Sequence, residues 1–391
     1  MNDGYEQPAV DAPRPPDVCT LVVADDACDE EWEGLASATR ATPFMRPGWM
    51  RAWMAAFAPR EQLQLLTVRR DGELVGLLPV LSNRRGTTAP ANAETGLVQP
   101  LARDSSAARA LVSRLMATGW QADLRFVPGG ELLDALIAEA GDRGGLHRCE
   151  LLRESPYTRV EGDFEAYQRE VLSKNRRTSL RRRRRRLEER GRVEMDMHDG
   201  RENLDALLTE GLRLELTGWK GEQGTAVLSR PDTERFYRSV ARWAADAGIL
   251  RLYLLRLDGR PLAFTYQLEQ HGITHSLKLV IDEEFREQGP GVLLAFQTLE
   301  SAFSRGDLHL YDWGGENEPY KQEFATGFDR QYRLQLYTPG VAGRLDRASA
   351  TAVSRARAEA RRRLSAETRQ RIVTTLSRAR SAVPGRDGRT E

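Results

Sequence analysis

The sequence predicts a mixed α/β protein, an α+β chain with a mixed sheet, built from two related halves. Leu63–Leu81 reads as a β-hairpin, because Asp71-Gly72 separates two apolar runs and supplies the positive φ angles of a tight turn. The same pattern returns at Leu250–Leu268 around Asp258-Gly259. An aromatic-rich helical pattern precedes each hairpin. The repeat indicates an internal duplication.

The elements around the two hairpins follow one order. Aromatic residues recur at helical spacing in 47–57 and in 233–247, and we expect both sets to pack in the core. After the second hairpin, His271-Gly272 predicts another turn and a third antiparallel strand. The segments expected next are that strand at 273–281, a glycine-containing loop, a helix at 292–304, a strand at 308–313, a short helix at 319–325 and a strand at 331–337. Such an order predicts a mixed sheet with helices on its faces.

The length predicts more than one domain. A chain of 391 residues exceeds what one hydrophobic core usually supports, since cores stop growing at roughly 250 to 300 residues. The predicted divisions are a disordered leader at 1–18, an N-terminal domain at 19–158, a C-terminal domain at 159–340 that includes a basic helix at 169–192, and a basic helical or disordered tail at 341–391.

Composition excludes several classes of protein. Hydrophobic residues make up 40% and charged residues 29%, and no apolar run approaches the roughly 18 residues of a membrane span. Met1–Val18 lacks the basic and then apolar order of a secretory signal, so we expect a cytoplasmic protein. Cys19, Cys28 and Cys149 are widely spaced and stand beside no histidine cluster, so we expect no metal site.

The segment 286–292 has the composition of a phosphate-binding turn. Gly289 and Gly291 allow close backbone approach, and the residues after them open an apolar helix. Backbone N–H groups converge at a helix start, where the helix dipole also favours an anion. Arg286 adds a positive charge, whereas Pro290 supplies no N–H. A short glycine loop is weak evidence alone, and its place between a predicted strand and a predicted helix strengthens it.

These residues carry a family resemblance. Arg286-x-x-Gly289-x-Gly291 resembles the Gln/Arg-x-x-Gly-x-Gly/Ala signature of GNAT acetyltransferases. Leu172–Leu180 with the arginines after it, Pro290-Gly291, and Gly315 through Tyr320-Lys321 are similar to the CelD-like and BioF2-like acetyltransferase branch. That branch resembles the FemABX transferases in architecture, which implies two tandem GNAT-like domains. The first half has no such glycine signature after its hairpin, which implies a degenerate N-terminal domain.

The resemblance implies an N-acyltransferase that uses acyl-CoA, most simply acetyl-CoA, as co-substrate. The acyl group would pass directly to a small-molecule amine, such as an amino sugar or amino acid, in polysaccharide, envelope or secondary-metabolite biosynthesis. Donor and acceptor would be held together in a ternary complex, without a covalent enzyme intermediate. Two other functions stay open: transfer from an aminoacyl-tRNA, as in Fem-like enzymes, and a non-catalytic binding or scaffold protein.

The resemblance also assigns residues by their position. The backbone of the strand before the glycine loop would pair with the pantetheine arm. The cofactor-binding residues implied are Leu279, Val280, Arg286, Glu287, Gln288, Gly289, Gly291 and Val292.

Catalytic and acceptor-side candidates follow the later strand. Tyr320 stands where many GNAT enzymes place a tyrosine that protonates the leaving thiolate, and its ordinary pKa near 10 suits a protonated group. Asp312, His275 and Glu316 are alternatives for the base, and ordered water is another. The acceptor-side candidates are Trp219 and Lys220 in a glycine-rich stretch, together with Trp313 and Lys321.

Six consecutive arginines, Arg181–Arg186, lie in a predicted helix that leaves only Leu180 and Leu187 as a possible buried seam. The repulsion between the arginines calls for an anionic neighbour. A peripheral anionic surface, nucleic acid or the acidic remainder of this chain could provide it. The resemblance implies a helix of this kind between the two halves, so we favour an interdomain helix with phosphate-contacting arginines. Aromatic residues for base stacking are absent from the run, so we expect no nucleic acid other than tRNA.

Overall fold

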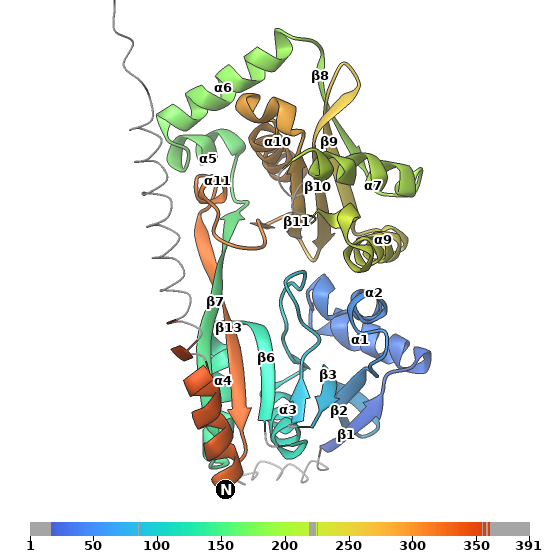
Figure 1. Cartoon of the computed structure of the whole chain (residues 1–391), viewed down its shortest axis with the longest axis vertical. Coiled ribbons are helices and arrows are strands. Elements are labelled where there is room, and N and C mark those ends of the chain that lie inside the picture. Colours follow the sequence, from blue (N-terminus) through green and yellow to red (C-terminus); the bar gives the residue numbers. More distant parts are fainter. Residues whose placement is uncertain are drawn as a thin grey trace, which may run out of the picture.

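The computed structural model describes residues 17–353 except 85, 120, 219–223 and 225, together with 355, 356 and 359. The described residues form one sheet of 13 strands, which runs through two lobes (Figure 1). The strand order is β1-β2-β3-β4-β6-β13-β7-β12-β11-β10-β9-β8, and β5 pairs with β3 at one side. The mixed sheet expected from the sequence is confirmed.

The strands are β1 (Val18–Val23), β2 (Gln64–Arg70), β3 (Glu73–Asn83), β4 (Gly86–Thr88), β5 (Leu101–Ala102), β6 (Gln121–Pro128), β7 (Leu146–Arg159), β8 (Val193–His198), β9 (Leu250–Leu257), β10 (Arg260–Gln270), β11 (Ile273–Ile281), β12 (Leu310–Asp312) and β13 (Gly327–Tyr337). The α-helices are α1 (Asp29–Ala38), α2 (Pro47–Phe57), α3 (Ser105–Ala117), α4 (Glu131–Asp142), α5 (Phe164–Glu170), α6 (Lys174–Glu188), α7 (Leu204–Arg213), α9 (Pro231–Asp246), α10 (Pro290–Arg305) and α11 (Pro319–Gln322). Short 3-10 helices are η1 (Asp26–Cys28), η2 (Pro43–Met45), η3 (Leu214–Thr217), η4 (Val227–Ser229) and η5 (Glu283–Gln288).

Both expected hairpins form where the Asp-Gly pairs predict them. Asp71 and Gly72 have φ angles of 52° and 83°, and Asp258 and Gly259 have 49° and 82°. Two consecutive positive φ angles define the turn that matches the natural twist of paired strands. The turn at His271-Gly272 has the same form, with 53° and 79°. The last strand is longer than expected, because β13 begins at Gly327 rather than at 331.

The two halves repeat one topology. In the first half, β3 pairs antiparallel with β4, and β4 lies parallel to β6. In the second half, β10 pairs antiparallel with β11, and β11 lies parallel to β12. The duplication inferred from the hairpins therefore extends to the strands that follow them.

Each half receives its final strand from the other half. The C-terminal strand β13 pairs with β6 of the first half, from Gln331 opposite Pro128 to Tyr337 opposite Gln121. The first half's last strand β7 reaches β12, where Tyr157 lies opposite Asp312. β7 and β13 also pair with each other and run along one side of both lobes (Figure 1). The boundary expected at residue 158 falls inside β7, a strand that both halves share.

Helices cover both faces of the second half's sheet. α5, α6 and α10 bury one core, to which α6 contributes the expected seam, with Leu180 4% and Leu187 0% exposed. α7 and α9 cover the other face, where the core continues into the first half. There the ring centroids of Trp49 in α2 and Phe236 in α9 lie 5.0 Å apart. A Cβ on Gly48 would lie 2.1 Å from the Trp243 indole, so only glycine permits this approach of α2 to α9.

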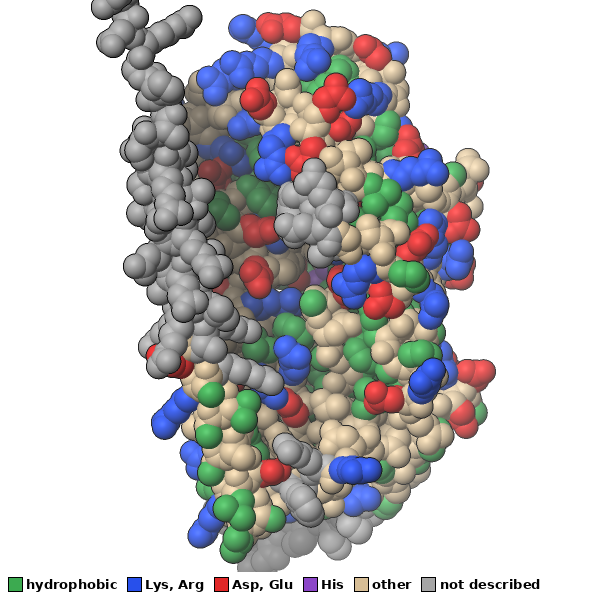
Figure 2. All heavy atoms as spheres, in the orientation of Figure 1, with side chains coloured by type: hydrophobic (Ala, Val, Ile, Leu, Met, Phe, Trp, Pro, Cys, Tyr) green, Lys and Arg blue, Asp and Glu red, His purple; other side chains and the backbone are tan. Residues whose placement is uncertain are grey.

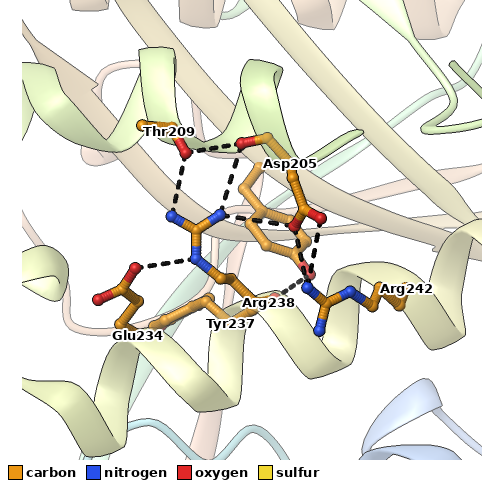
Figure 3. A network of polar contacts seen from close by, with 7 residues as sticks. Asp205, Thr209, Glu234, Tyr237, Arg238 and Arg242 are labelled. Atoms are coloured by element: carbon orange, nitrogen blue, oxygen red, sulfur yellow. Dashed lines mark hydrogen bonds and ion pairs between the residues drawn. The ribbon is translucent and has the colours of Figure 1, made fainter. Parts of the chain in front are cut away.

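A polar network fixes α7 against α9 (Figure 3). Arg238 donates to Glu234 at 2.9 Å, to Thr209 at 3.0 Å and to the carbonyl oxygen of Asp205 at 3.4 Å. Arg242 donates to the Asp205 carboxylate at 3.1 Å. Partly exposed ion pairs add little stability, so the network mainly sets the angle between the helices. Since α7 continues directly into η3, it also positions the Leu214–Thr217 turn.

The predicted ends of the chain are described only in part. Of the predicted leader, Asp17 pairs with Arg70 and Val18 begins β1, while residues 1–16 lie outside the described residues. Residues 341–353 are helical, in agreement with the helical alternative for this part of the tail. No described helix is long and apolar enough to cross a membrane.

The shared strands generate a prediction about separated halves. Residues 1–161 and 162–391, cut at the exposed turn around Gly162, would each present a long strand without its native neighbours. Exposed strand edges pair with other chains, so we expect each half to aggregate when expressed alone. Co-expression should restore a soluble one-to-one complex on size-exclusion chromatography, with the intact chain as reference. A monomeric half that unfolds cooperatively by itself would contradict the exchange.

Candidate active site

The glycine loop has the geometry expected of an anion-binding turn. η5 ends at Gly289, which adopts the left-handed conformation with φ 67° and ψ 51°, and α10 begins at Pro290. A side chain there would be strained, and its Cβ would also lie 2.0 Å from Nη1 of Arg183. A Cβ on Gly291 would lie 2.6 Å from the Ile281 side chain. The left-handed backbone therefore favours glycine at 289, and the close approach of Ile281 favours it at 291.

Pro290, at the first position of α10, reduces the number of N–H groups available to an anion less than the sequence suggests. The first N–H groups of a helix have no acceptor within the helix, so Pro290 removes a group that makes no intrahelical hydrogen bond. The Gly289 N–H is already bonded to carbonyl oxygens of Phe285 and Arg286. The N–H groups of Gly291 and Val292 follow in the first turn and can face an anion.

The strand before this loop separates from its parallel neighbour. β11 pairs with β12 only at Ile273–His275. One residue later β11 carries a β-bulge, because Lys278 lies opposite Tyr266 while Ser276 lies opposite Gln267, which leaves Leu277 as the extra residue. The edge of β11 beyond His275 is thus free of β12. An extended arm could pair with this edge, as the resemblance implies for pantetheine.

A pocket of about 440 Å³ joins this edge to the loop. Seven of the residues implied by the resemblance line it: Leu279, Val280, Arg286, Gly289, Gly291, Val292 and Tyr320. It is also lined by Arg183 of α6, Leu214 and Glu215 of η3, Gly218, Ile281, Glu283 and Glu318. Two of the implied cofactor-binding residues, Glu287 and Gln288, are not among these lining residues.

The charges in the pocket differ from the sequence-based expectation. Arg286, expected to face phosphate, is paired with Glu283, to which its Nη2 donates at 2.7 Å. Arg183 instead lies over the loop and donates to the Glu287 carbonyl oxygen at 3.2 Å. Glu215 is a buried carboxylate that accepts the Val227 N–H at 2.8 Å. No motif in η3 marks Glu215 as a pocket residue, and no local pattern separates Arg183 from the five arginines beside it.

Tyr320 reaches the pocket from the start of α11. Burial raises the pKa of its hydroxyl above the ordinary value, and the charge of Glu318 adds to this rise. The phenol is therefore protonated at neutral pH and can donate a hydrogen bond or a proton. A protonated phenol is the state that donation of a proton to the leaving thiolate would require.

His275 and Asp312 form a buried pair at the point where β11 and β12 diverge. His275 Nδ1 and Asp312 Oδ2 are 3.0 Å apart, and the side chains are 5% and 17% exposed. Asp312 also accepts the Gly314 N–H at 2.8 Å and the Ser155 hydroxyl at 3.4 Å. Burial raises the pKa of Asp312, but the hydrogen bonds from His275 and Gly314 outweigh it and hold the pKa below its ordinary value.

The other candidates lie in different surroundings. Trp313 is buried, donates to the Thr158 hydroxyl at 2.9 Å and packs in the core rather than at the pocket. Lys321 is also buried and donates to the Gly314 carbonyl oxygen at 2.7 Å, which fixes the turn after β12. Glu316 is exposed in that turn. Trp219 and Lys220 lie outside the described residues.

An additional link joins β11 to the first half. Glu94, from the loop after β4, accepts the Tyr237 hydroxyl proton at 2.7 Å and lies 3.3 Å from Lys278 Nζ. Burial raises the pKa of Tyr237 well above its ordinary value, and the Glu94 charge adds to this rise. The first half therefore holds the bulged part of β11 in place.

The equivalent helix start in the first half is closed to anions. Asp104 caps α3, and its Oδ1 accepts the Ala107 N–H at 2.9 Å. Arg70 donates to the same carboxylate at 2.8 Å, and these hydrogen bonds lower the pKa of Asp104 to about 2. A carboxylate thus stands where the second half presents Gly289-Pro290-Gly291.

No group of His, Cys, Asp and Glu suited to a metal ion occurs within the part of the chain described.

The diverging parallel strands, the bulge and the glycine turn define an acyl-transferring domain of the GNAT fold. Residues 174–322 match the family model described as acetyltransferase (GNAT) domain. No curated protein matches the chain. The second half is thus a GNAT domain, and the repeated topology makes the whole a duplicated GNAT fold.

Solved structures extend this likeness over both halves. FemX is similar with a TM-score of 0.55 at 13% identity, covering 81% of this chain and 96% of FemX. A conserved protein of unknown function from Bacteroides thetaiotaomicron gives 0.54 at 11%, with 82% and 100% covered. L-PGS from Bacillus licheniformis gives 0.52 at 11%, with 79% and 90% covered. At these identities the likeness concerns the fold.

The His275–Asp312 pair predicts a pH-dependent stability difference. Asp312→Asn should lower the free energy of unfolding by about 1–3 kcal/mol at pH 7, because a charged hydrogen-bond acceptor is lost in a buried site. A lowered carboxyl pKa stabilises the fold above the unfolded value near 3.9, and this contribution is lost as pH falls through the folded pKa. In urea unfolding, the free energies of unfolding of wild type and Asp312→Asn should therefore approach each other as the pH falls below about 4.

Asp134→Asn, at an exposed position of α4, is the matched control and should leave the unfolding free energy nearly unchanged throughout. If the difference in unfolding free energy between wild type and Asp312→Asn stayed constant from about pH 3.5 to 7, the charge of Asp312 would not be the cause of that difference.

Proposed function

We propose that the protein is an N-acyltransferase that transfers an acyl group, most simply acetyl, from acyl-CoA to a small-molecule amine. The observation that carries the proposal is the single pocket wall formed by the free edge of β11, the Gly289–Val292 turn and Tyr320. The residues fit the donor. Gly289 and Gly291 leave space that side chains would fill, and the start of α10 offers N–H groups for a pyrophosphate.

The reaction needs four changes of bonding. The amine nitrogen attacks the thioester carbonyl carbon, the carbon–sulfur bond breaks, the amine loses a proton and the thiolate gains one. Backbone N–H groups on the open edge of β11 would polarise the carbonyl. Tyr320 would protonate the thiolate, since its raised pKa keeps the phenol protonated.

The base has two kinds of candidate. Glu215 is a buried carboxylate on the pocket wall, so it could take the amine proton directly. His275 lies two residues before the bulged Leu277 of β11, and Asp312 lies beside it on β12. This pair could act through water, while Glu316 would need its exposed turn to reach the pocket. An amino sugar or amino acid from polysaccharide, envelope or secondary-metabolite biosynthesis, as in the CelD-like and BioF2-like branch, is the proposed acceptor class.

A second candidate donor is an aminoacyl-tRNA. The observation that favours it is the exposed run of arginines on α6, of which Arg183 lines the pocket. Figure 2 shows Lys and Arg side chains at this end of the molecule, with Asp and Glu side chains among them. Salt-sensitive tRNA binding that disappears when Arg181, Arg182 and Arg186 are neutralised would select this donor. A protein that binds neither donor would instead fit the non-catalytic alternative.

Donor binding predicts a selective effect of Gly291→Val. The added side chain meets Ile281 at the pocket wall, so the Kd for acetyl-CoA should rise by about tenfold or more in isothermal titration calorimetry. Gly34→Val is the control, because that helical glycine is exposed and no heavy atom lies within 4 Å of where its Cβ would stand. Unchanged affinity in Gly291→Val would place the donor elsewhere, and no binding by wild type would overturn the CoA proposal.

The proposed role of Tyr320 predicts that its substitution changes kcat but not KM. Tyr320→Phe should lower kcat on the order of 100-fold and leave KM for acyl-CoA nearly unchanged, because the hydroxyl acts on the leaving group. Thiol release can be followed with a panel of amino sugars and amino acids. Tyr332→Phe on β13, outside the pocket lining, should keep normal kcat. An equal loss in both variants, or a change in KM alone, would remove Tyr320 from the chemical step.

A further inference from the structure

Arg183 is the arginine of α6 that approaches the glycine loop. It lies three residues after the buried Leu180 and four residues before the buried Leu187, so its side chain leaves the helix beside the packed face rather than on the solvent face. Its Nη1 donates to the Glu287 carbonyl oxygen at 3.2 Å and lies 2.0 Å from where a Gly289 Cβ would stand. The packing of two leucines thus fixes a guanidinium above the start of α10.

The loop's own arginine is already neutralised. Arg286 binds Glu283 through both Nε and Nη2, so its charge is satisfied within η5. Glu318 also lines the pocket, and its carboxylate lies 3.1 Å from Lys321 Nζ. A pyrophosphate placed at Gly289–Val292 would therefore find the loop's own side-chain cation already paired with a carboxylate.

Arg183 differs from its neighbours in its partners. Arg184 and Arg185 pair with Glu188 and Glu189 one turn later, at 2.8 and 3.0 Å. Within the described part of the chain, no carboxylate lies at ion-pair distance from Arg183. Its Nε donates to the Ser179 hydroxyl at 3.4 Å, and its charge remains available beside the pocket.

We propose that Arg183 binds the phosphates of the donor together with the N–H groups of Gly291 and Val292, which makes α6 part of the donor site. The proposal rests on the acyl-CoA function above. A guanidinium offers a fork of N–H groups that matches two phosphate oxygens, and the helix start supplies the remaining donors. The arginine run would then have one member that contacts the ligand and several that keep the surrounding surface positive.

The test is calorimetric titration of the full-length protein with CoA at about 50 and about 300 mM NaCl, which differ in screening length. Arg183→Gln should raise the Kd about tenfold at low salt, because a charged hydrogen bond to phosphate is lost, and by less at high salt. Arg182→Gln removes a neighbouring exposed charge that contacts neither loop nor pocket, and should change the Kd by less than about twofold. Arg183→Lys, which keeps the charge without the fork, should fall between wild type and Arg183→Gln.

The outcomes separate the two proposals. Wild-type binding with an unchanged Kd in Arg183→Gln overturns the role of Arg183 and leaves acyl-CoA as donor. Equal losses in Arg182→Gln and Arg183→Gln indicate a general field from α6 and also overturn the contact. Failure of wild type to bind CoA overturns both. Thermal unfolding of each variant shows whether the fold is kept, and the Arg183→Lys titration decides the matter if Arg183→Gln does not fold.

Discussion

The pairing of β7 with β13 is the constraint on which the rest of the structure depends. These two strands stand at the centre of the strand order, and each also completes the sheet of the half to which it does not belong in sequence. The parallel pair β11–β12, whose divergence opens the candidate site, is therefore held on its far side by a strand from the first half. The same half fixes β11 through Glu94 and packs α2 against α9. The first half thus supports the site, although no residue described in that half lines the pocket.

Electrostatics distinguishes the equivalent helix starts of the two halves. A helix start attracts negative charge, and the first half meets this preference internally with Asp104 and Arg70. The second half leaves its helix start open behind two glycines, and places Arg183 of a separate helix beside it. The duplicated topology therefore holds two equivalent positions, of which one is filled by the protein itself.

Local signals predicted the parts of the structure that local chemistry determines. The Asp-Gly and His-Gly turns, the strand-loop-helix at Gly289 and the Leu180–Leu187 seam depend on neighbouring residues, and each is present. Strand exchange depends on register between segments nearly two hundred residues apart, which periodicity does not encode. The phase of α6 against the loop also depends on packing, so six similar arginines could not be told apart. A tryptophan side chain suits a pocket wall and a hydrophobic core equally well, and in the structure Trp313 packs in the core.

The interlocked strands also couple ligand binding to the stability of the whole chain. A ligand that binds only the folded state stabilises it by RT ln(1 + [L]/Kd), and this free energy acts on whichever region unfolds together with the site. Neither half can leave the sheet without breaking the β7–β13 pairing, so the two lobes form one cooperative unit. A donor bound in the second half would thereby protect the first half's amide hydrogens from exchange, although none of that half's described residues lines the pocket.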